Sequence, residues 1–473
     1  MDEKRMGGGT AVAGGDVNGR RAGRGRLHLW TLAGLVTGAA AGLTTGQLCP
    51  PGPDGAPHAG LAWVVRNIAD PVGQVFLRLI FMVVLPLVFS ALVLGVAGLG
   101  DVRQLGRVGL KTLALTVGLS AVSVGIGVGL TNVVRPGAHL SQQQQEVLRE
   151  RYGSGAAEKV AIAREAKPVR DALLEIIPRN PLREMVGAVD GSSPGGGMLA
   201  VMFFALLFGV ALTLVPQRAG PVIHVLEGVY AAVMVIVGWA MRLAPVAVAS
   251  LVFSLTATLG TDILRALGWY VLTVLGGLAL HFCGVYSLVV ALLARTNPLR
   301  FLSRVSEAVI TAFATSSSNA TLPTSLRVAQ EHLGLRRDVS SFVLTVGSTA
   351  NQNGTALYEG VTVLFIAQVF GIELSVAQRV TVVLLSILAG VGTAGVPGGS
   401  LPLVVMVLQT VNVPAEGIGI ILGVDRLLDM SRTTLNVTGD LAVAACIDRW
   451  ERSHGGGRSQ SQPVASEREG GWK

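Results

Sequence analysis

The sequence predicts an all-α membrane protein, and two observations support this fold class. Hydrophobic residues make up 51% of the 473 residues and charged residues only 14%, whereas soluble domains carry about 25% charged residues. The apolar residues also form long runs that match the roughly 20 residues a helix needs to cross a bilayer. A chain of this length has room for about eight such helices and their loops.

Both ends of the chain are polar. Residues 1–26 are rich in Gly and Arg and show no signal-peptide cleavage site, so we expect a disordered cytoplasmic tail. Residues 452–473 are expected to form a second disordered cytoplasmic tail. The net charge of +8 lies largely in these tails and in short loops such as 103–111 and 295–304. This distribution is typical of a topology signal, with both termini inside, and not of nucleic-acid binding.

The uninterrupted apolar runs come first along the chain. A Pro- and Gly-rich loop separates the first two runs. The polar stretch 138–197 lies outside by alternation, and we expect a partly helical or disordered extracellular insertion there. The runs cover residues 27–48, 72–98, 112–134, 198–215, 219–258 and 262–294.

Two later segments, 305–335 and 376–412, are apolar but broken in the middle. The breaks carry SSSNATLP at 316–323 and GTAGVPGGSLP at 392–402, so each segment is predicted to be two half-length helices around a polar tip. Non-helical backbone at membrane depth is stable only where protein or a water-filled cavity satisfies its polar groups. A pair of such segments indicates a transport site, and the alternative is two kinked helices.

The last apolar segment, at about 415–447, carries a polar stripe. Five polar residues at offsets 0, 3, 4, 7 and 11 fall on one face of a helix. A charged side chain near the centre of a membrane helix costs about 2.5–3.5 kcal/mol, so we expect the stripe to face a cavity or other polar groups. A structural Arg–Asp pair that ties helices together is the alternative. The stripe consists of Asp429, Arg432, Thr433, Asn436 and Asp440.

These residue types indicate a carrier for a small acidic zwitterion. The planar guanidinium of Arg432 suits a carboxylate, and Asp429 suits an ammonium group. Sodium prefers oxygen ligands. We therefore predict a cation-coupled carrier with no catalytic residues and no resident cofactor, and a serine hydrolase is disfavoured because the chain has no GxSxG elbow. The predicted sources of cation ligands are Asp440, Asn436, Asn351 and unwound backbone around Gly354.

These motifs resemble the dicarboxylate/amino acid:cation symporter family, which has the excitatory amino acid (glutamate/aspartate) transporter fold. The resemblance runs from about residue 27 to 451. Its most specific parts are SSSNATLP, NQNGTALYEG, GTAGVPGG and DRLLDMSRTTLNVTGD in combination. It implies eight transmembrane helices plus two re-entrant helical hairpins in an elevator-type transporter. It also implies a homotrimer that crosses a bacterial-type inner (plasma) membrane several times.

The resemblance implies a division of the chain into two parts. Residues 27–258 would form mainly the scaffold and trimerisation region, apart from the third span. Residues 259–451 would form the transport domain, to which the third span also belongs. Within that domain the second hairpin, around 393–399, would be the extracellular gate.

The resemblance further implies roles for individual residues. Asp429 would bind the amino group of the substrate and Arg432 its side-chain carboxylate. The implied substrate-binding residues are Ser318, Thr355, Gly395, Asp429, Arg432, Thr433 and Asn436. The implied sodium ligands are Asn351, Asn436 and Asp440 at one site, and Val391 and Thr393 at a second.

One family motif is altered in this chain. The usual Asn-Met-Asp-Gly-Thr reads NQNGT at 351–355, so Asn353 replaces a carboxylate that binds a third sodium ion in the family. A Tyr-x-x-Thr-Ser stretch of the same site reads Thr116, Leu119 and Ser120 at its three specified positions. We predict that the third sodium site is absent or altered.

Glu359 lies where proton-coupled members of the family carry Glu, so proton coupling is a second hypothesis, with a solvated or salt-bridged Glu as the alternative. The predicted function is import of aspartate or glutamate, driven by sodium, protons or both. A C4-dicarboxylate carrier, in which the residue matching Asp429 is replaced, is one alternative. A channel-like or non-transporting family member is another.

Overall fold

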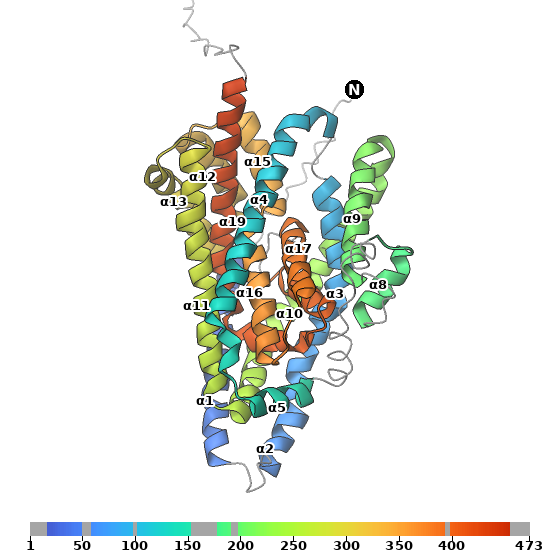
Figure 1. The fold of residues 1–473 in the computed structure, drawn as a ribbon, viewed down its shortest axis with the longest axis vertical. Coiled ribbons are helices and arrows are strands. Elements are labelled where there is room, and N and C mark those ends of the chain that lie inside the picture. Colours follow the sequence, from blue (N-terminus) through green and yellow to red (C-terminus); the bar gives the residue numbers. More distant parts are fainter. Residues whose placement is uncertain are drawn as a thin grey trace, which may run out of the picture.

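The computed structural model describes residues 17–49, 58–97, 102–152, 177–190, 197–392 and 398–454, and these ranges contain helices and no strand. The longest helices follow the long axis of the molecule (Figure 1). The all-helical class predicted from the sequence is confirmed.

Several helices are suited to a membrane. Among the described residues, four helical stretches are long and apolar enough to cross a bilayer, and shorter apolar helices follow at 200–214, 376–390 and 401–410. The number of eight spans stays a prediction. The four long stretches are Ala59–Ala97, Val108–Ala138, Pro216–Leu259 and Asp262–Leu292.

One group of helices packs around α10 (Pro216–Leu259). Helix α1 (Val17–Leu48) lies along α10 because glycines remove the side chains between them. A Cβ atom at Gly34 would meet the Pro245 carbonyl oxygen at 2.4 Å, and small residues allow this close approach of membrane helices. The other side of α10 packs on α3 (Asp70–Ala97), which is preceded by α2 (Ala59–Val64) and η1 (Val65–Ala69) and is covered by α9 (Gly197–Leu214).

Both predicted tails are shorter than expected. Helix α1 begins at Val17, so residues 17–26 are helical and their assignment to a disordered tail is wrong. Arginine is a good helix former, and a helix once nucleated extends at little cost. The last helix likewise runs to His454. Residues 1–16 and 455–473 lie outside the described residues.

A second group of helices surrounds α19 (Ile418–His454), which follows η5 (Ala415–Gly417). Helix α16 (Asn353–Val369) packs between α19 and α4 (Val102–Val134). Nearly every residue of α16 is buried, including the polar residues Asn353, Thr355 and Glu359. Helix α11 (Asp262–Leu280) continues through η3 (His281–Val285) into α12 (Tyr286–Leu292). Helix α11 contacts α4, α16 and α19.

The two predicted interruptions lie between short helices. Helix α13 (Pro298–Thr315) is followed by Ser316, whose backbone is left-handed with φ 49°. Helix α14 (Ser318–Arg327) begins two residues later and leads into η4 (Val328–His332), so the first tip consists of Ser316 and Ser317. The Ser317 hydroxyl caps α14 by accepting a hydrogen bond from Ala320 N. The second interruption separates α17 (Val376–Gly392) from α18 (Leu401–Thr410).

A third interruption occurs within the predicted span 341–370. Helix α15 (Arg337–Ala350) and α16 are separated by Asn351 and Gln352, whose backbones are not helical. The sequence placed this unwinding around Gly354, and that position is wrong because Gly354 lies in the first turn of α16.

The insertion and the molecular ends are polar. Within 138–197 the structure describes η2 (Pro136–His139) at its border, α5 (Gln142–Tyr152) and α8 (Pro181–Asp190), so the insertion is partly helical.

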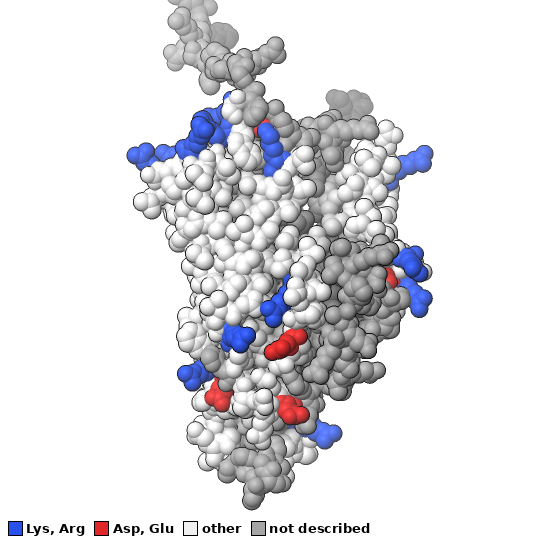
Figure 2. All heavy atoms as spheres, in the orientation of Figure 1, with Lys and Arg blue, Asp and Glu red and all other residues white. Residues whose placement is uncertain are grey.

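Figure 2 shows basic side chains gathered at the upper end of the molecular face that it draws, near the turn from α12 to α13, above a largely uncharged surface. Arg295, Arg300 and Arg304 in that region are exposed.

Candidate functional site

The polar stripe of α19 is buried inside the protein. All five side chains predicted to share one face have exposed fractions of 5% or less. The sequence therefore located correctly a polar surface that does not face lipid. The fractions are 5% for Asp429, 2% for Arg432, 5% for Thr433, 2% for Asn436 and 4% for Asp440.

Arg432 forms an ion pair within its own helix. Its Nη2 and Nε atoms donate to Asp429 Oδ1 at 2.9 and 3.1 Å, and its Nη1 lies 3.5 Å from Asp425 Oδ1. The guanidinium carbon lies 4.2 Å from the centre of the Tyr358 ring, a cation–π arrangement. Because Arg432 and Asp429 are three residues apart on α19, their pair does not tie two helices together, which was the structural alternative.

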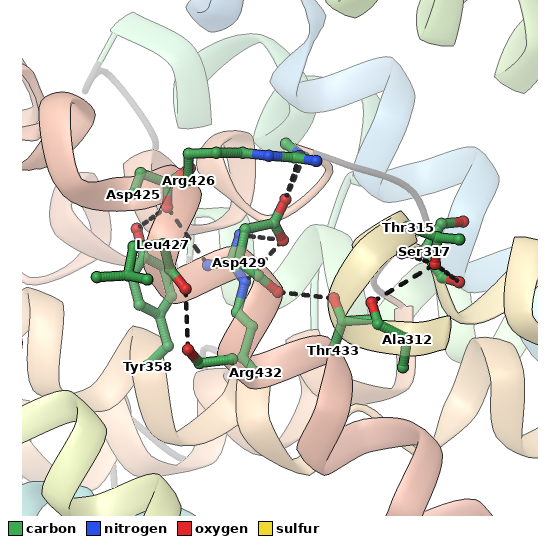
Figure 3. Close-up of polar contacts among 12 residues, drawn as sticks. Ala312, Thr315, Ser317, Tyr358, Asp425, Arg426, Leu427, Asp429, Arg432 and Thr433 are labelled. Atoms are coloured by element: carbon green, nitrogen blue, oxygen red, sulfur yellow. Dashed lines mark hydrogen bonds and ion pairs between the residues drawn. The ribbon is translucent and has the colours of Figure 1, made fainter. Parts of the chain in front are cut away.

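Both carboxylate oxygens of Asp429 accept hydrogen bonds (Figure 3). Its Oδ2 accepts from Arg426 Nη1 at 3.2 Å and from the backbone N–H of Gly398 at 3.3 Å. Gly398 has φ +76° and lies within the interruption between α17 and α18, so the second broken segment touches this carboxylate directly. Thr433 Oγ1 donates to the Asp429 carbonyl at 2.7 Å.

Asp425 lies one turn before Asp429 on the same face. It is 4% exposed, and it accepts from the Tyr358 hydroxyl at 2.7 Å. Sequence reasoning missed Asp425, Arg426 and Tyr358. Extending the helical periodicity of the stripe back by one turn would have found the first two, since they precede Asp429 by four and three residues.

Asn436 connects α19 to the start of α16. Its Oδ1 accepts from Gly354 N at 2.7 Å, and its Nδ2 donates to Thr355 Oγ1 at 3.3 Å and to Gln352 Oε1. Gln352 Nε2 in turn donates to Ser348 O at 2.8 Å and lies 3.5 Å from Ser318 Oγ at the first interruption. The predicted residues Ser318, Thr355 and Asn436 are thus brought together, and the structure adds Gln352 between them.

Two of the three residues predicted to bind one sodium ion are in contact. Asn351 Nδ2 donates to Asp440 Oδ1 at 2.8 Å, and both residues are buried. Gly347 makes this approach possible, because a Cβ atom there would lie 2.4 Å from Asp440 Oδ1. Of the second predicted sodium site, Val391 lies near the end of α17. Thr393 and the predicted substrate contact Gly395 lie outside the described residues.

Residues predicted to form an altered third cation site take part in a hydrogen-bond network. Ser120 Oγ donates to Asn353 Oδ1 at 2.7 Å, and Asn353 Nδ2 donates to the Tyr286 hydroxyl at 3.0 Å. Thr116 and Leu119, the two other predicted members, are buried on the same helix as Ser120.

Glu359 lies one turn along α16 from Thr355. The side chain is 0% exposed, and neither carboxylate oxygen has a hydrogen-bond partner among the described residues. This excludes the solvated alternative that the sequence left open, and no salt bridge involving Glu359 is found within the described part of the chain.

The chain matches a known family over almost its whole length. Residues 27–450 match the sodium:dicarboxylate symporter family. The chain belongs to this family. The resemblance inferred from the motifs is therefore confirmed.

Relatives in the family differ in substrate. The proton/sodium-glutamate symport protein of Bacillus subtilis (strain 168) is 33% identical over 83% of this chain and 89% of its own length. The proton/glutamate-aspartate symporter of Escherichia coli (strain K12) is 33% identical over 86% of this chain and 90% of its own. Neutral amino acid transporter B(0) of Oryctolagus cuniculus is 32% identical over 90% and 80%. Overall sequence identity therefore does not determine which substrate is bound, so the side chains of the site must determine it.

Proposed function

We propose that this protein is a secondary active symporter that imports aspartate or glutamate with a cation gradient as the driving force. The single observation that supports this most strongly is the buried Arg432–Asp429 pair, which the second interrupted segment contacts through Gly398. The names of its relatives support the same substrate class.

The ion pair can exchange partners with an acidic amino acid. The substrate ammonium takes the place of the Arg432 guanidinium at Asp429, and the substrate side-chain carboxylate takes the place of Asp429 at Arg432. Two buried charge-assisted contacts are broken and two are formed, so Asp429, Arg432 and the substrate's ammonium and side-chain carboxylate groups all remain paired. The remaining carboxylate of the substrate would accept hydrogen bonds from the hydroxyls of Ser318 and Thr355, and the cotransported cation would balance its charge. A neutral amino acid lacks the second carboxylate, so nothing would replace Asp429 at Arg432, whose remaining ion-pair contact would be the one with Asp425 at 3.5 Å.

Cations would bind beside the substrate. Asp440, with the carbonyl oxygens of Asn351 and Asn436, offers the hard oxygen ligands that sodium prefers, and the contact between Asn351 and Asp440 supports a site there. An unpaired buried carboxylate is costly when ionised, so Glu359 would carry a proton during part of the cycle. The third sodium site of the family would be replaced by the neutral amide of Asn353.

The packing supports an elevator arrangement. Helices α1, α3, α9 and α10 would form the trimerisation scaffold, and α4 would travel with α11 to α19 as the transport domain. The contact of Gly398 with Asp429 supports a gating role for the second broken segment. The exposed basic turn after α12 would lie in the cytoplasm with both termini.

Uptake into proteoliposomes tests this function. We expect saturable uptake of radiolabelled aspartate that responds to sodium and proton gradients imposed separately. Arg432→Gln should weaken aspartate binding by about a hundredfold, because two charge-assisted hydrogen bonds are lost. Substrate-independent current without saturable uptake would indicate a channel, and saturable binding without counterflow would indicate a non-transporting protein.

A further inference from the structure

Three arginines at the turn from α12 to α13 have exposed side chains and no carboxylate beside them. They are Arg295, Arg300 and Arg304, and no ion pair involving them is found among the described residues. The segment 293–306, which contains all three, carries no Asp or Glu. These arginines belong to the basic upper end of the face drawn in Figure 2.

Other arginines at the same end of the molecule are paired with carboxylates of the chain itself. This end also includes η4, the start of α15 and the end of α19, which lie close to α13. The ion pairs there are Arg327 with Glu307, Arg336 with Asp338, and Arg452 with Asp448. The three arginines of the turn are therefore the ones that an anion outside the protein can reach and pair with.

The backbone of the turn holds these arginines in place. Arg295 is left-handed, with φ 52°, a conformation that glycine adopts easily and that is unfavourable for a residue with a Cβ atom. The Asn297 side chain caps α13 by accepting from the N–H groups of Leu299 and Arg300 at 2.9 and 3.2 Å. Arg300 and Arg304 follow one turn apart on the same face of the helix. An arginine kept where glycine would be less strained indicates that its side chain has a use.

The turn lies at the end of a helical stretch that is suited to the membrane. Asp262–Leu292 is long and apolar enough to cross a bilayer, and Arg295 follows its end by three residues. Exposed leucines flank the arginines, with exposed fractions of 60% for Leu288, 63% for Leu292 and 77% for Leu299. Leucines beside arginines at the end of a membrane helix match the boundary between acyl chains and phosphate groups.

We propose that this turn binds the headgroup of an anionic phospholipid at the cytoplasmic membrane surface, with Arg295, Arg300 and Arg304 contacting the phosphate and Leu299 contacting the acyl chains. The planar guanidinium group matches two phosphate oxygens at once, and anionic lipids give the cytoplasmic leaflet its negative surface potential. The inference rests on the proposed placement of the turn in the cytoplasm and is independent of the substrate that is carried.

Native mass spectrometry of the purified full-length protein, titrated with phosphatidylglycerol or phosphatidylcholine of the same acyl chains, tests the proposal. The parent should bind phosphatidylglycerol at least about tenfold more tightly than phosphatidylcholine. Arg300→Gln combined with Arg304→Gln should weaken phosphatidylglycerol binding about twenty- to thirtyfold, or about fivefold for each arginine. Binding of phosphatidylcholine should not change.

The matched control is Arg327→Gln combined with Arg336→Gln. It removes the same charge from the same end, but from arginines that are already paired, so phosphatidylglycerol binding should weaken less than about twofold. Equal weakening in the two double variants would show that only net charge matters and would refute the site. Equal binding of the two lipids by the parent would refute it without any variant.

Arg295→Gly separates loss of the site from loss of the fold. Glycine relieves the left-handed backbone, so this variant should unfold at a higher temperature than the parent while it binds phosphatidylglycerol about fivefold more weakly. Unchanged binding would remove Arg295 from the site. Competition by soluble glycerophosphate would show a small phosphate ligand and overturn the assignment to a lipid. Lipid preference without aspartate uptake would refute only the proposed function.

Discussion

The Asn353 amide nitrogen, in the first turn of α16, donates a hydrogen bond to the Tyr286 hydroxyl at the start of α12, with 3.0 Å between the two atoms. The Tyr286 hydroxyl in turn donates a hydrogen bond to the Leu435 carbonyl oxygen at 3.2 Å. On the other side, Asn353 Oδ1 accepts from Ser120. The network joins α4, α12, α16 and α19 through neutral groups. An ionised aspartate at position 353 could not donate a hydrogen bond to Tyr286.

We predict that Asn353→Asp combined with Leu119→Thr makes the protein more dependent on sodium. The lost donor and the added buried charge should lower stability without sodium by about 1–3 kcal/mol, and bound sodium should restore it. Thermal unfolding in detergent with and without sodium measures this, and the sodium stoichiometry of uptake should rise. Leu119→Thr alone is the control. An unchanged stoichiometry in the double variant would count against an altered third site.

We predict that Gly354→Ala weakens aspartate binding. The new Cβ atom would lie 2.6 Å from the Arg432 carbonyl oxygen and 3.0 Å from its Cα, so α16 and α19 must move apart. Small displacements at a binding site cost about ten- to hundredfold in activity. Gly276→Ala on α11 is a matched control with open space around it, and it should be neutral or slightly stabilising. Equal uptake kinetics in both variants would contradict the prediction.

We predict that Glu359→Gln removes most of the response of uptake to a proton gradient. A buried carboxyl without a hydrogen-bond partner favours its neutral form, so the amide keeps the shape of that form but cannot release a proton. In the parent, raising the external pH should slow uptake, and in the variant the rate should change little. Glu373→Gln, at an exposed position, should behave as the parent. Equal pH profiles for parent and Glu359→Gln would exclude the proton role.

We predict that Gln352→Met lowers the affinity for aspartate about three- to tenfold, since each lost hydrogen bond is worth about 0.5–1.5 kcal/mol. Methionine cannot accept from Asn436 or donate to Ser348, so Asn436 retains fewer contacts that hold its amide in place. Titration calorimetry of the purified protein measures the change. Gln217→Met, at an exposed position, is the control. An unaltered affinity would mean that Gln352 does not position Asn436.

The sequence was sufficient for most of the architecture. Long apolar runs predicted the helices, and the Ser- and Gly-rich breaks predicted where α13 and α14, and α17 and α18, separate. The helix boundaries were less certain, as the start of α1 at Val17 demonstrates, because a helix continues into flanking residues that hydropathy does not mark.

The motifs and long apolar runs were enough to assign the family and the membrane character, and helical periodicity was enough to assign the polar face of α19. Which groups meet across different helices became known from the folded structure. It placed Asp429 against both Arg426 and Gly398, and it joined Asn353 to Ser120 and Tyr286. Periodicity carries no information about partners on other helices, because these are selected by close packing and by the need to pair every buried polar group.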